Sequence, residues 1–449
     1  MLSGVLTLWS NCVSPLDAAG TSLGRTRPLI IRNESMELDV SFVRKQFPAF
    51  QTKEVEDWAF FENAGGSYVP ASVIKRLQRF HIEHKVQPYG AFALSQKAGD
   101  QMDESYQAMS ELINTSQDQI TIGPSTTLNL YILAQGLRHL LKPGDQIVVT
   151  NQDHEANVGC WRRLSEHGVV IREWRVDKAD GELDLADLGK LVNDKTRIVC
   201  CSLCSNLVGT HNDMSSISEI THKVGALLVA DGVSYAPHAV PDIDNMGVDF
   251  YVYSTYKTFG THQGILWGSP EALKNVKGQG HVFNEDDSRC RLNPTGPQHA
   301  EIAALAGITD YIDDLYDHHF QDSGYSRHER ARKVFDLVSQ HESELANIFL
   351  SFLANRDDVH LLGQEKAEPG ERAPTISFHS RTMLSKHIAQ ELAKHRIGVG
   401  SGNFYALRCI EALGMDPQDG VVRVSMVHYN TKEEVGKLVS TLGQILDLA

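Results

Sequence analysis

Between residues 119 and 265 the sequence alternates short apolar runs with stretches of helical spacing, and this alternation constrains the fold more than any other feature. The apolar runs are nearly continuous, as in strands that are buried on both faces. Strands that alternate with helices favour a parallel or mixed sheet with helices packed on both sides. We therefore predict an α/β domain with strands at 119–123, 146–150, 169–171, 196–203, 227–231 and 249–254.

Polar residues follow these strands at the point where each one ends. Because parallel strands bring their carboxyl ends to one edge of a sheet, where open α/β sheets bind ligands, we expect these residues to lie together. One such residue alone is weak support for a ligand-binding site, whereas five such positions at one edge of a sheet are strong support. In chain order they are the turn Ser125-Thr126-Thr127, then His154, Asn206, Asp231 and Lys257.

Lys257 is the residue with the most specific chemistry. It follows the aromatic run Phe250-Tyr251-Val252-Tyr253. Burying an ammonium group is costly, but desolvation lowers the lysine pKa and frees the amine to attack aldehydes. That property is required to hold pyridoxal phosphate (PLP) as a Schiff base. The alternative for Lys257 taken alone is an ordinary surface lysine beyond a strand.

Two further features fit a cofactor of this kind. The turn Ser125-Thr126-Thr127 opens a helix, so it offers backbone N–H groups and hydroxyls to a phosphate, unless Ser125 or Thr126 is simply a helix cap. Asp231 ends an apolar strand, where it can be a paired buried anion or a helix cap. In a cofactor pocket its carboxylate would keep a pyridine nitrogen protonated.

The bulk properties exclude several classes of protein. The formal charge is −15 without a block of Lys or Arg, so we expect no nucleic-acid or anionic-membrane partner. No apolar run approaches the ~18 residues of a membrane span. Seven cysteines in 449 residues suggest reduced thiols in a cytoplasmic protein. Cys201 and Cys204 have the spacing of half a zinc site, but a second half is missing from the sequence, so we expect no metal.

The chain divides by pattern into four parts. Residues 1–35 lack a basic stretch before their apolar start, so we expect a disordered extension, with a mitochondrial targeting segment as the weaker alternative. Residues 36–70 are expected to pack with the small domain. Residues 71–310 form the predicted large domain, and residues 311–449 a smaller α+β domain with helices at 327–353, 384–395 and 431–448.

At this point the sequence resembles the class V aminotransferases of PLP fold type I, in the branch that contains the cysteine desulfurases. The resemblance covers roughly residues 40 to 445, with family-like order and spacing. It implies a large domain with a mostly parallel, seven-stranded type of sheet. The matching pieces are Ser125-Thr126-Thr127, Asp153-His154-Glu155-Ala156-Asn157, Ser205-Asn206-Leu207-Val208-Gly209-Thr210, Asp231-Gly232, Ser254-Thr255-Tyr256-Lys257, Arg423-Val424-Ser425 and Tyr429-Asn430-Thr431.

The resemblance implies a role for each site residue. Lys257 would carry the Schiff base and move protons, Asp231 would pair with the pyridine nitrogen, and His154 would stack on the ring. Arg423 would bind the substrate carboxylate, helped by the loop Asn63-Ala64-Gly65. Thr295 would reach the phosphate of the neighbouring subunit in a homodimer with shared active sites. Asn206 and Ser234 would lie beside the phenolic oxygen, and the phosphate would be held by Ser125, Thr126, Thr127, Ser254 and Tyr256.

One departure from the family pattern bears on the reaction. Desulfurases carry a nucleophilic cysteine on a small-domain loop, but residues 398–406 of this chain contain none, and Cys409 falls in a predicted helix. A persulfide cannot form without a thiolate. We therefore expect a PLP-dependent transferase or lyase that acts on a small amino acid. The alternatives are a true cysteine desulfurase and a catalytically silent PLP-fold binding protein.

Overall fold

A computed structural model describes residues 36–284 and 287–448, so the predicted extension at 1–35 lies outside the described residues. Its central sheet has seven strands in the order β2-β8-β7-β6-β5-β3-β4. Only β8 runs against its neighbours, which confirms the prediction of a mostly parallel sheet. The strands are Ile120–Gly123 (β2), Gln146–Thr150 (β3), Val170–Trp174 (β4), Thr196–Ser202 (β5), Leu227–Asp231 (β6), Phe250–Ser254 (β7) and Gly264–Gly268 (β8).

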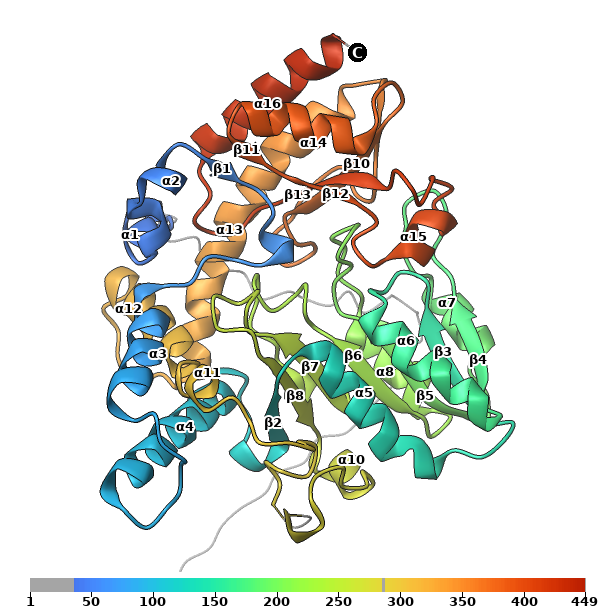
Figure 1. The fold of residues 1–449 in the computed structure, drawn as a ribbon. Helices are drawn as coiled ribbons and strands as arrows, with labels where there is room; N and C mark the ends of the chain where they lie inside the picture. Colours follow the sequence, from blue (N-terminus) through green and yellow to red (C-terminus); the bar gives the residue numbers. More distant parts are fainter. Residues whose placement is uncertain (1–35, 285–286, 449) are drawn as a thin grey trace, which may run out of the picture. The chain divides into compact units, whose positions relative to one another are not determined.

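Helices cover both faces of this sheet, which explains why its inner strands are mostly apolar, whereas the edge strand β4 carries Arg172 and Glu173 (Figure 1). Successive residues of β5 and β7 point to opposite faces, so that Cys200 and Phe250 enter one core and Cys201 and Tyr251 the other. The first face packs against Thr126–Leu137 (α5), Ala156–Arg162 (α6) and Pro270–Lys274 (α10). The second packs against Ala93–Leu112 (α4), Leu185–Leu191 (α7) and Met214–His222 (α8).

Further helices extend the core on the second face. Gly307 shows how closely they pack, because a Cβ there would lie 2.6 Å from the backbone of Val73. The helices α3, α11 and α12 contact one another or α4, whereas α9 packs beside α8. Their bounds are Ala71–Glu83 (α3), Ile243–Met246 (α9), His299–Ala303 (α11) and Ala306–His319 (α12).

A second, antiparallel sheet has four strands in the order β12-β13-β10-β9 and its own apolar core. The strands are Val359–Leu361 (β9), Thr375–Ser380 (β10), Gly400–Gly402 (β12) and Val421–Ser425 (β13). The helices around it are Arg327–Ala354 (α13), Ser385–Lys394 (α14), Leu407–Ala412 (α15) and Lys432–Asp447 (α16). The division of the chain at residue 310 remains a prediction.

The N-terminal part packs with both regions, because Val43 and Phe47 lie in the core on the second face of the central sheet and Ala59 lies in the core of the second sheet. Strand β1 (Ala59–Phe60) pairs in parallel with β11 (Ile397–Gly398), after two short helices at Val40–Lys45 (α1) and Lys53–Glu56 (α2). Phe61 is buried in the core of the second sheet. The pairing places the following turn, Asn63–Gly65 (η2), beside β13. No helix in the described ranges is long and apolar enough to cross a membrane.

Candidate active site

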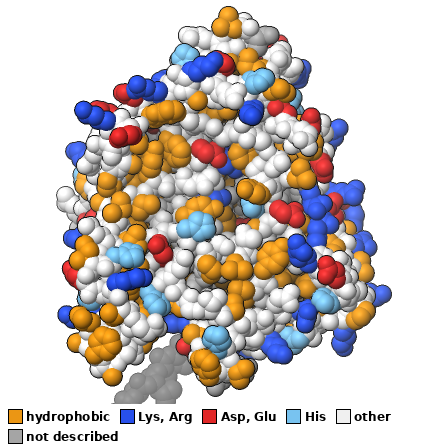
Figure 2. Space-filling model, in the orientation of Figure 1, with side chains coloured by type: hydrophobic (Ala, Val, Ile, Leu, Met, Phe, Trp, Pro, Cys, Tyr) orange, Lys and Arg blue, Asp and Glu red, His pale blue; other side chains and the backbone are white. Residues whose placement is uncertain are grey.

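A cavity that is open to solvent lies at the carboxyl ends of the parallel strands, with about 460 Å³ of empty space counted together with its open mouth. In Figure 2 the surface is hollowed near the middle of the face shown, over this edge of the sheet. The cavity brings together residues that are up to 131 positions apart in sequence, because each follows a strand that ends at the same edge. Nine predicted site residues line it: Thr126, Thr127, His154, Asn206, Asp231, Ser234, Ser254, Tyr256 and Lys257.

The end of the cavity beside α5 has the features of an anion site. Thr126 is the first residue of α5, and its hydroxyl lies 2.8 Å from the hydroxyl of Ser254 at the end of β7. The free N–H groups and the dipole of the 12-residue helix favour a negative charge here. Gly264 allows the close approach, since a Cβ there would lie 2.3 Å from the backbone nitrogen of Thr126. This end can therefore hold a phosphate.

Lys257 is buried in the cavity wall. Burial lowers its pKa to about 8, helped by the positive charge of Arg423 and opposed by Asp231 and Glu62. The turn that carries Lys257 is fixed by Ser67, whose hydroxyl donates to the Lys257 carbonyl at 3.1 Å and accepts from the Phe259 N–H at 3.2 Å. Because its pKa is low, a substantial fraction of Lys257 is a free amine near neutral pH.

Asp231 ends β6 on the wall of the same cavity. Burial raises its pKa to about 6, although the Val233 N–H, which donates to Oδ1 at 2.8 Å, and the charge of Lys257 both favour the ionised form. A buried carboxylate in this state gains stability from a cationic partner. The protonated nitrogen of a pyridine ring would be such a partner.

His154 lies just beyond β3 and is neutral at physiological pH. Its pKa is lowered to about 4, mainly by burial and then by the charges of Lys257 and Arg423. Its Nδ1 accepts the Ala156 N–H at 3.1 Å, so the proton is on Nε2. The ring of Tyr405 lies 5.2 Å away, centroid to centroid. A neutral imidazole in this position can stack on a cofactor ring.

The loop with Phe404 and Tyr405 closes one side of the site. Both residues have positive φ angles, 50° and 59°, which are costly for bulky side chains. Hydrogen bonds hold them there: Asn206 donates to the Phe404 carbonyl at 3.0 Å, and the Glu155 N–H donates to the Tyr405 carbonyl at 2.7 Å. This is the segment in which the desulfurase pattern has a loop cysteine and this chain has none.

Arg423 reaches the site from β13 in the second sheet. Its Nη2 donates to Glu62 Oε1 at 2.7 Å, its Nη1 donates to the Asn206 carbonyl at 3.2 Å, and its Cζ lies 3.8 Å from the centre of the Phe404 ring. Burial lowers the pKa of Arg423, and Glu62 opposes that shift. The hydrogen bond to Asn206, which lines the cavity, places the charge of Arg423 close to it, and this charge lowers the pKa of both Lys257 and His154.

Six predicted site residues are not part of the cavity wall, and Arg423 is one of them. Ser125 caps α5 by accepting the Leu128 N–H at 3.2 Å, and Thr295 is exposed, with its hydroxyl donating to the Gly296 carbonyl at 3.1 Å. Ala64 donates its N–H to Ser425, and Gly65 follows in the same turn.

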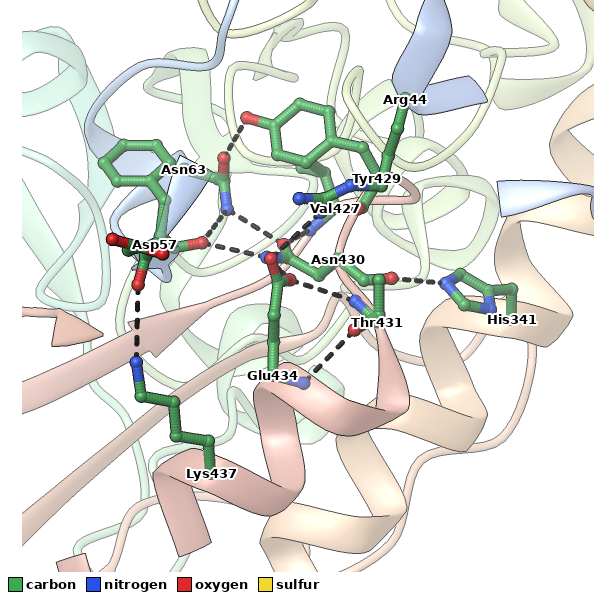
Figure 3. A network of polar contacts seen from close by, with 11 residues as sticks. Arg44, Asp57, Asn63, His341, Val427, Tyr429, Asn430, Thr431, Glu434 and Lys437 are labelled. Carbon is green, nitrogen blue, oxygen red and sulfur yellow. Dashed lines mark hydrogen bonds and ion pairs between the residues drawn. The ribbon is translucent and has the colours of Figure 1, made fainter. Parts of the chain in front are cut away.

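Asn63, the last of these residues, points into a polar network with Tyr429 and Asn430 (Figure 3). Its Nδ2 donates to the Ser425 carbonyl at 2.8 Å and to Asn430 Oδ1 at 3.2 Å, and the Tyr429 hydroxyl donates to its Oδ1. The network continues through Asn430, which donates to Glu434 at 3.1 Å. Asn63 therefore fixes the turn that contains it.

Three residues at the site were not predicted from the sequence: Glu62, Ser202 and Cys204. Ser202 and Cys204 line the cavity, while Glu62 contacts Arg423. The signal for Glu62 was present, because a carboxylate follows directly on the apolar run Ala59-Phe60-Phe61. Ser202 and Cys204 carry no local signal, since a serine and a cysteine are common at strand ends and in loops.

The residues present fit pyridoxal phosphate. The cavity offers a phosphate site at α5, a buried amine for the aldehyde, a carboxylate for the ring nitrogen and a neutral imidazole. Asn206 Oδ1 is also buried without a hydrogen-bond partner among the described residues. A cavity with this set of groups can hold a phosphorylated pyridine aldehyde.

The fold and this pocket define the fold type I class of PLP-dependent enzymes. A cysteine desulfurase from Thermococcus onnurineus NA1 superposes with a TM-score of 0.79 and 22% identity, covering 92% of this chain and 100% of that chain. The chain belongs to the class V aminotransferase family, because the model described as "Aminotransferase class-V" matches residues 59–438.

Two curated relatives agree with this assignment. "Aminotransferase-like protein FGM3" from Gibberella zeae is 33% identical over 421 residues, which cover 92% of this chain and 100% of the relative. "Cysteine desulfurase-like protein ustD" from Aspergillus flavus is 30% identical, and the match covers 91% of this chain and 91% of the relative. The predictions of the family, the fold class and a PLP-dependent enzyme are confirmed.

Proposed function

We propose that this protein holds PLP through a Schiff base with Lys257 and acts on a small amino acid by aminotransferase or lyase-type chemistry. The observation that carries the proposal is that Lys257 and Asp231 line one cavity, with the charge of Arg423 close by. When bound, PLP supplies an electron-accepting ring that stabilises negative charge at the substrate Cα. These residues would have the same roles in an aminotransferase and in a lyase.

Each residue of the cavity wall has a defined task in this proposal. The Nζ of Lys257 binds the aldehyde carbon and later moves a proton at the substrate Cα. Asp231 holds a proton on the ring nitrogen, which its raised pKa and burial support. The neutral ring of His154 packs against the pyridine ring and orients it. Asn206 and Ser234 face the phenolic oxygen, and the unpaired Oδ1 of Asn206 supports that position.

The phosphate and the substrate carboxylate are held at separate positions. Thr126, Thr127, Ser254 and Tyr256 hold the phosphate together with the N–H groups of α5, and Ser125 caps that helix. Arg423 binds the carboxylate by charge-assisted hydrogen bonds. The turn Asn63-Ala64-Gly65 supports Arg423 from the side, with Asn63 locking the turn.

We also propose a cytoplasmic homodimer with shared active sites. The exposure of Thr295 supports this, because its hydroxyl can exchange the local bond to the Gly296 carbonyl for one to the phosphate of a neighbouring subunit. Sedimentation analysis should give twice the 49.8 kDa chain mass. Thr295→Ala should weaken PLP binding in the dimer, and unchanged binding would remove Thr295 from the site.

Cysteine desulfurase activity is the weaker candidate. Persulfide formation requires a thiolate that can reach the substrate sulfur. Residues 398–406 contain no cysteine, and Cys409 is buried in α15, where burial raises its pKa to about 12. Cys204 lines the cavity, but burial likewise raises its pKa to about 12. Both thiols stay protonated at physiological pH.

The decisive experiment measures PLP attachment and then substrate response. Purified protein with PLP should develop a visible absorption band, and borohydride should add the cofactor mass to the peptide that carries Lys257. Lys257→Ala should abolish both signals, whereas Lys274→Ala, at an exposed lysine paired with Glu271, should retain them. A colourless protein that borohydride cannot trap would refute the proposal. Spectral changes on addition of amino acids, with product identification, separate an enzyme from a silent binding protein.

A further inference from the structure

A buried ion pair already occupies the arginine assigned to the substrate carboxylate. Glu62 Oε1 and Arg423 Nη2 are 2.7 Å apart, and the Arg423 side chain is only 4% exposed, against 28% for Glu62. The two residues are 361 positions apart and meet because Glu62 forms a bridge with Ser425 of β13. The polar network in Figure 3 fixes the adjacent Asn63, so the backbone of Glu62 is held in place.

The pair leaves hydrogen-bonding capacity unused on both partners. Among the described residues, Arg423 Nε and Glu62 Oε2 are buried and have no hydrogen-bond partner. The Phe404 ring covers one face of the guanidinium, 3.8 Å from Cζ, which excludes water and strengthens the local electrostatics. Arg423 can therefore donate hydrogen bonds to a second carboxylate, either in addition to Glu62 or in its place.

The second sheet keeps space for the Glu62 carboxylate. Gly400 of β12 lies directly opposite Arg423 in the antiparallel pairing with β13. A Cβ at Gly400 would lie 2.2 Å from Glu62 Oε2 and 2.7 Å from Cε1 of Phe404. Any larger residue at position 400 would thus push the carboxylate away from the arginine. Gly398, two residues earlier, has no such contact, since its nearest neighbour would be 3.7 Å away.

We infer that Glu62 is a displaceable carboxylate that holds Arg423 before the substrate binds and competes with the substrate carboxylate for it. A buried guanidinium without a partner is costly, so Glu62 balances the charge of Arg423 and orients it. When a second carboxylate enters, the two negative charges repel in a site of low dielectric. Glu62 is the more exposed partner, so its carboxylate moves toward solvent while Arg423 stays fixed.

This inference rests on the proposed role of Arg423 and makes Glu62 a positioning residue that sets carboxylate affinity. The test uses the PLP-loaded enzyme and propionate, a carboxylate without an amine, with calorimetry as the readout. Glu62→Gln keeps the shape and removes the charge, so propionate should bind roughly 10-fold more tightly. The KM for an amino-acid substrate should fall in the same variant. Gly400→Ala should shift both values in the same direction, and the matched Gly398→Ala should leave them unchanged.

The direction in which propionate affinity changes in Glu62→Gln distinguishes competition by Glu62 from simple support of Arg423. Weaker or unchanged propionate binding in Glu62→Gln would overturn the inference, because Glu62 would then only hold Arg423 in place. If Glu62→Gln does not fold, propionate affinity is measured in Gly400→Ala instead. Tighter binding there supports the inference, and weaker or unchanged binding overturns it. Arg423→Gln tests the proposed function independently: propionate binding should be lost, and retained binding would refute the role of Arg423 rather than that of Glu62.

Discussion

Lys257 should react with PLP at a pH well below the range in which an ordinary lysine does so. Burial and the charge of Arg423 lower its pKa from 10.5 to about 8. At pH 7.5 a group with this pKa is roughly one-quarter deprotonated, against about 0.1% for an ordinary lysine. The concentration of free amine is therefore roughly 250 times higher, and the rate of attack on the aldehyde should rise in proportion.

The assay measures the rate of covalent attachment between pH 6 and 10.5. Apoenzyme is mixed with PLP, quenched with borohydride at set times and analysed by mass spectrometry at Lys257. The rate should rise with pH and level off above about pH 8, because the amine is then mostly deprotonated. A free lysine derivative provides the control, since its rate continues to rise toward its own pKa and reports the titration of PLP itself.

A substitution at Arg423 tests the cause of the low pKa. Arg423→Met removes a positive charge and leaves Glu62 unbalanced, and both changes favour the protonated form of Lys257. The midpoint of the rate profile should therefore move to higher pH, by on the order of one unit. Arg423→Lys should stay near the wild-type midpoint. A wild-type midpoint of 10 or above, or a downward shift in Arg423→Met, would refute the reasoning.

Three further predictions concern the ring, the phosphate and the turn beside the site. Asp231→Asn should retain PLP but lower turnover on the order of 100-fold, because a neutral amide does not stabilise a protonated ring nitrogen; unchanged kcat in steady-state kinetics would contradict this role. Ser254→Ala should raise the Kd for PLP about 10-fold in equilibrium dialysis, through loss of one charge-assisted hydrogen bond; an unaltered Kd would remove Ser254 from the phosphate site. Asn63→Ala should lower the free energy of unfolding by about 2–3 kcal/mol in urea denaturation, since the Tyr429 hydroxyl and the Ser425 carbonyl lose their partner; a loss below ~0.5 kcal/mol would show that the network contributes little.

Local patterns were sufficient for most elements of the fold, although some boundaries differ. The strand predicted at 146–150 is observed as Gln146–Thr150, because a short apolar run between turns has few alternatives. The strand predicted at 169–171 is observed as Val170–Trp174, because pairing with β3 extends it beyond its apolar pattern. Strand β8 was not predicted, because two glycines frame its short apolar core.

The sequence by itself determined most of the cavity wall. Thr126, His154, Asp231 and Lys257 each lie at the end of a strand or just beyond it, and the topology of a parallel sheet carries every such position to one edge. Only the tertiary structure decided which groups meet across the two sheets. Glu62 and Arg423 are paired over 361 positions, and Asn63 is turned toward Tyr429. Periodicity encodes which face of an element is buried, but a polar contact between distant segments depends on how the elements pack.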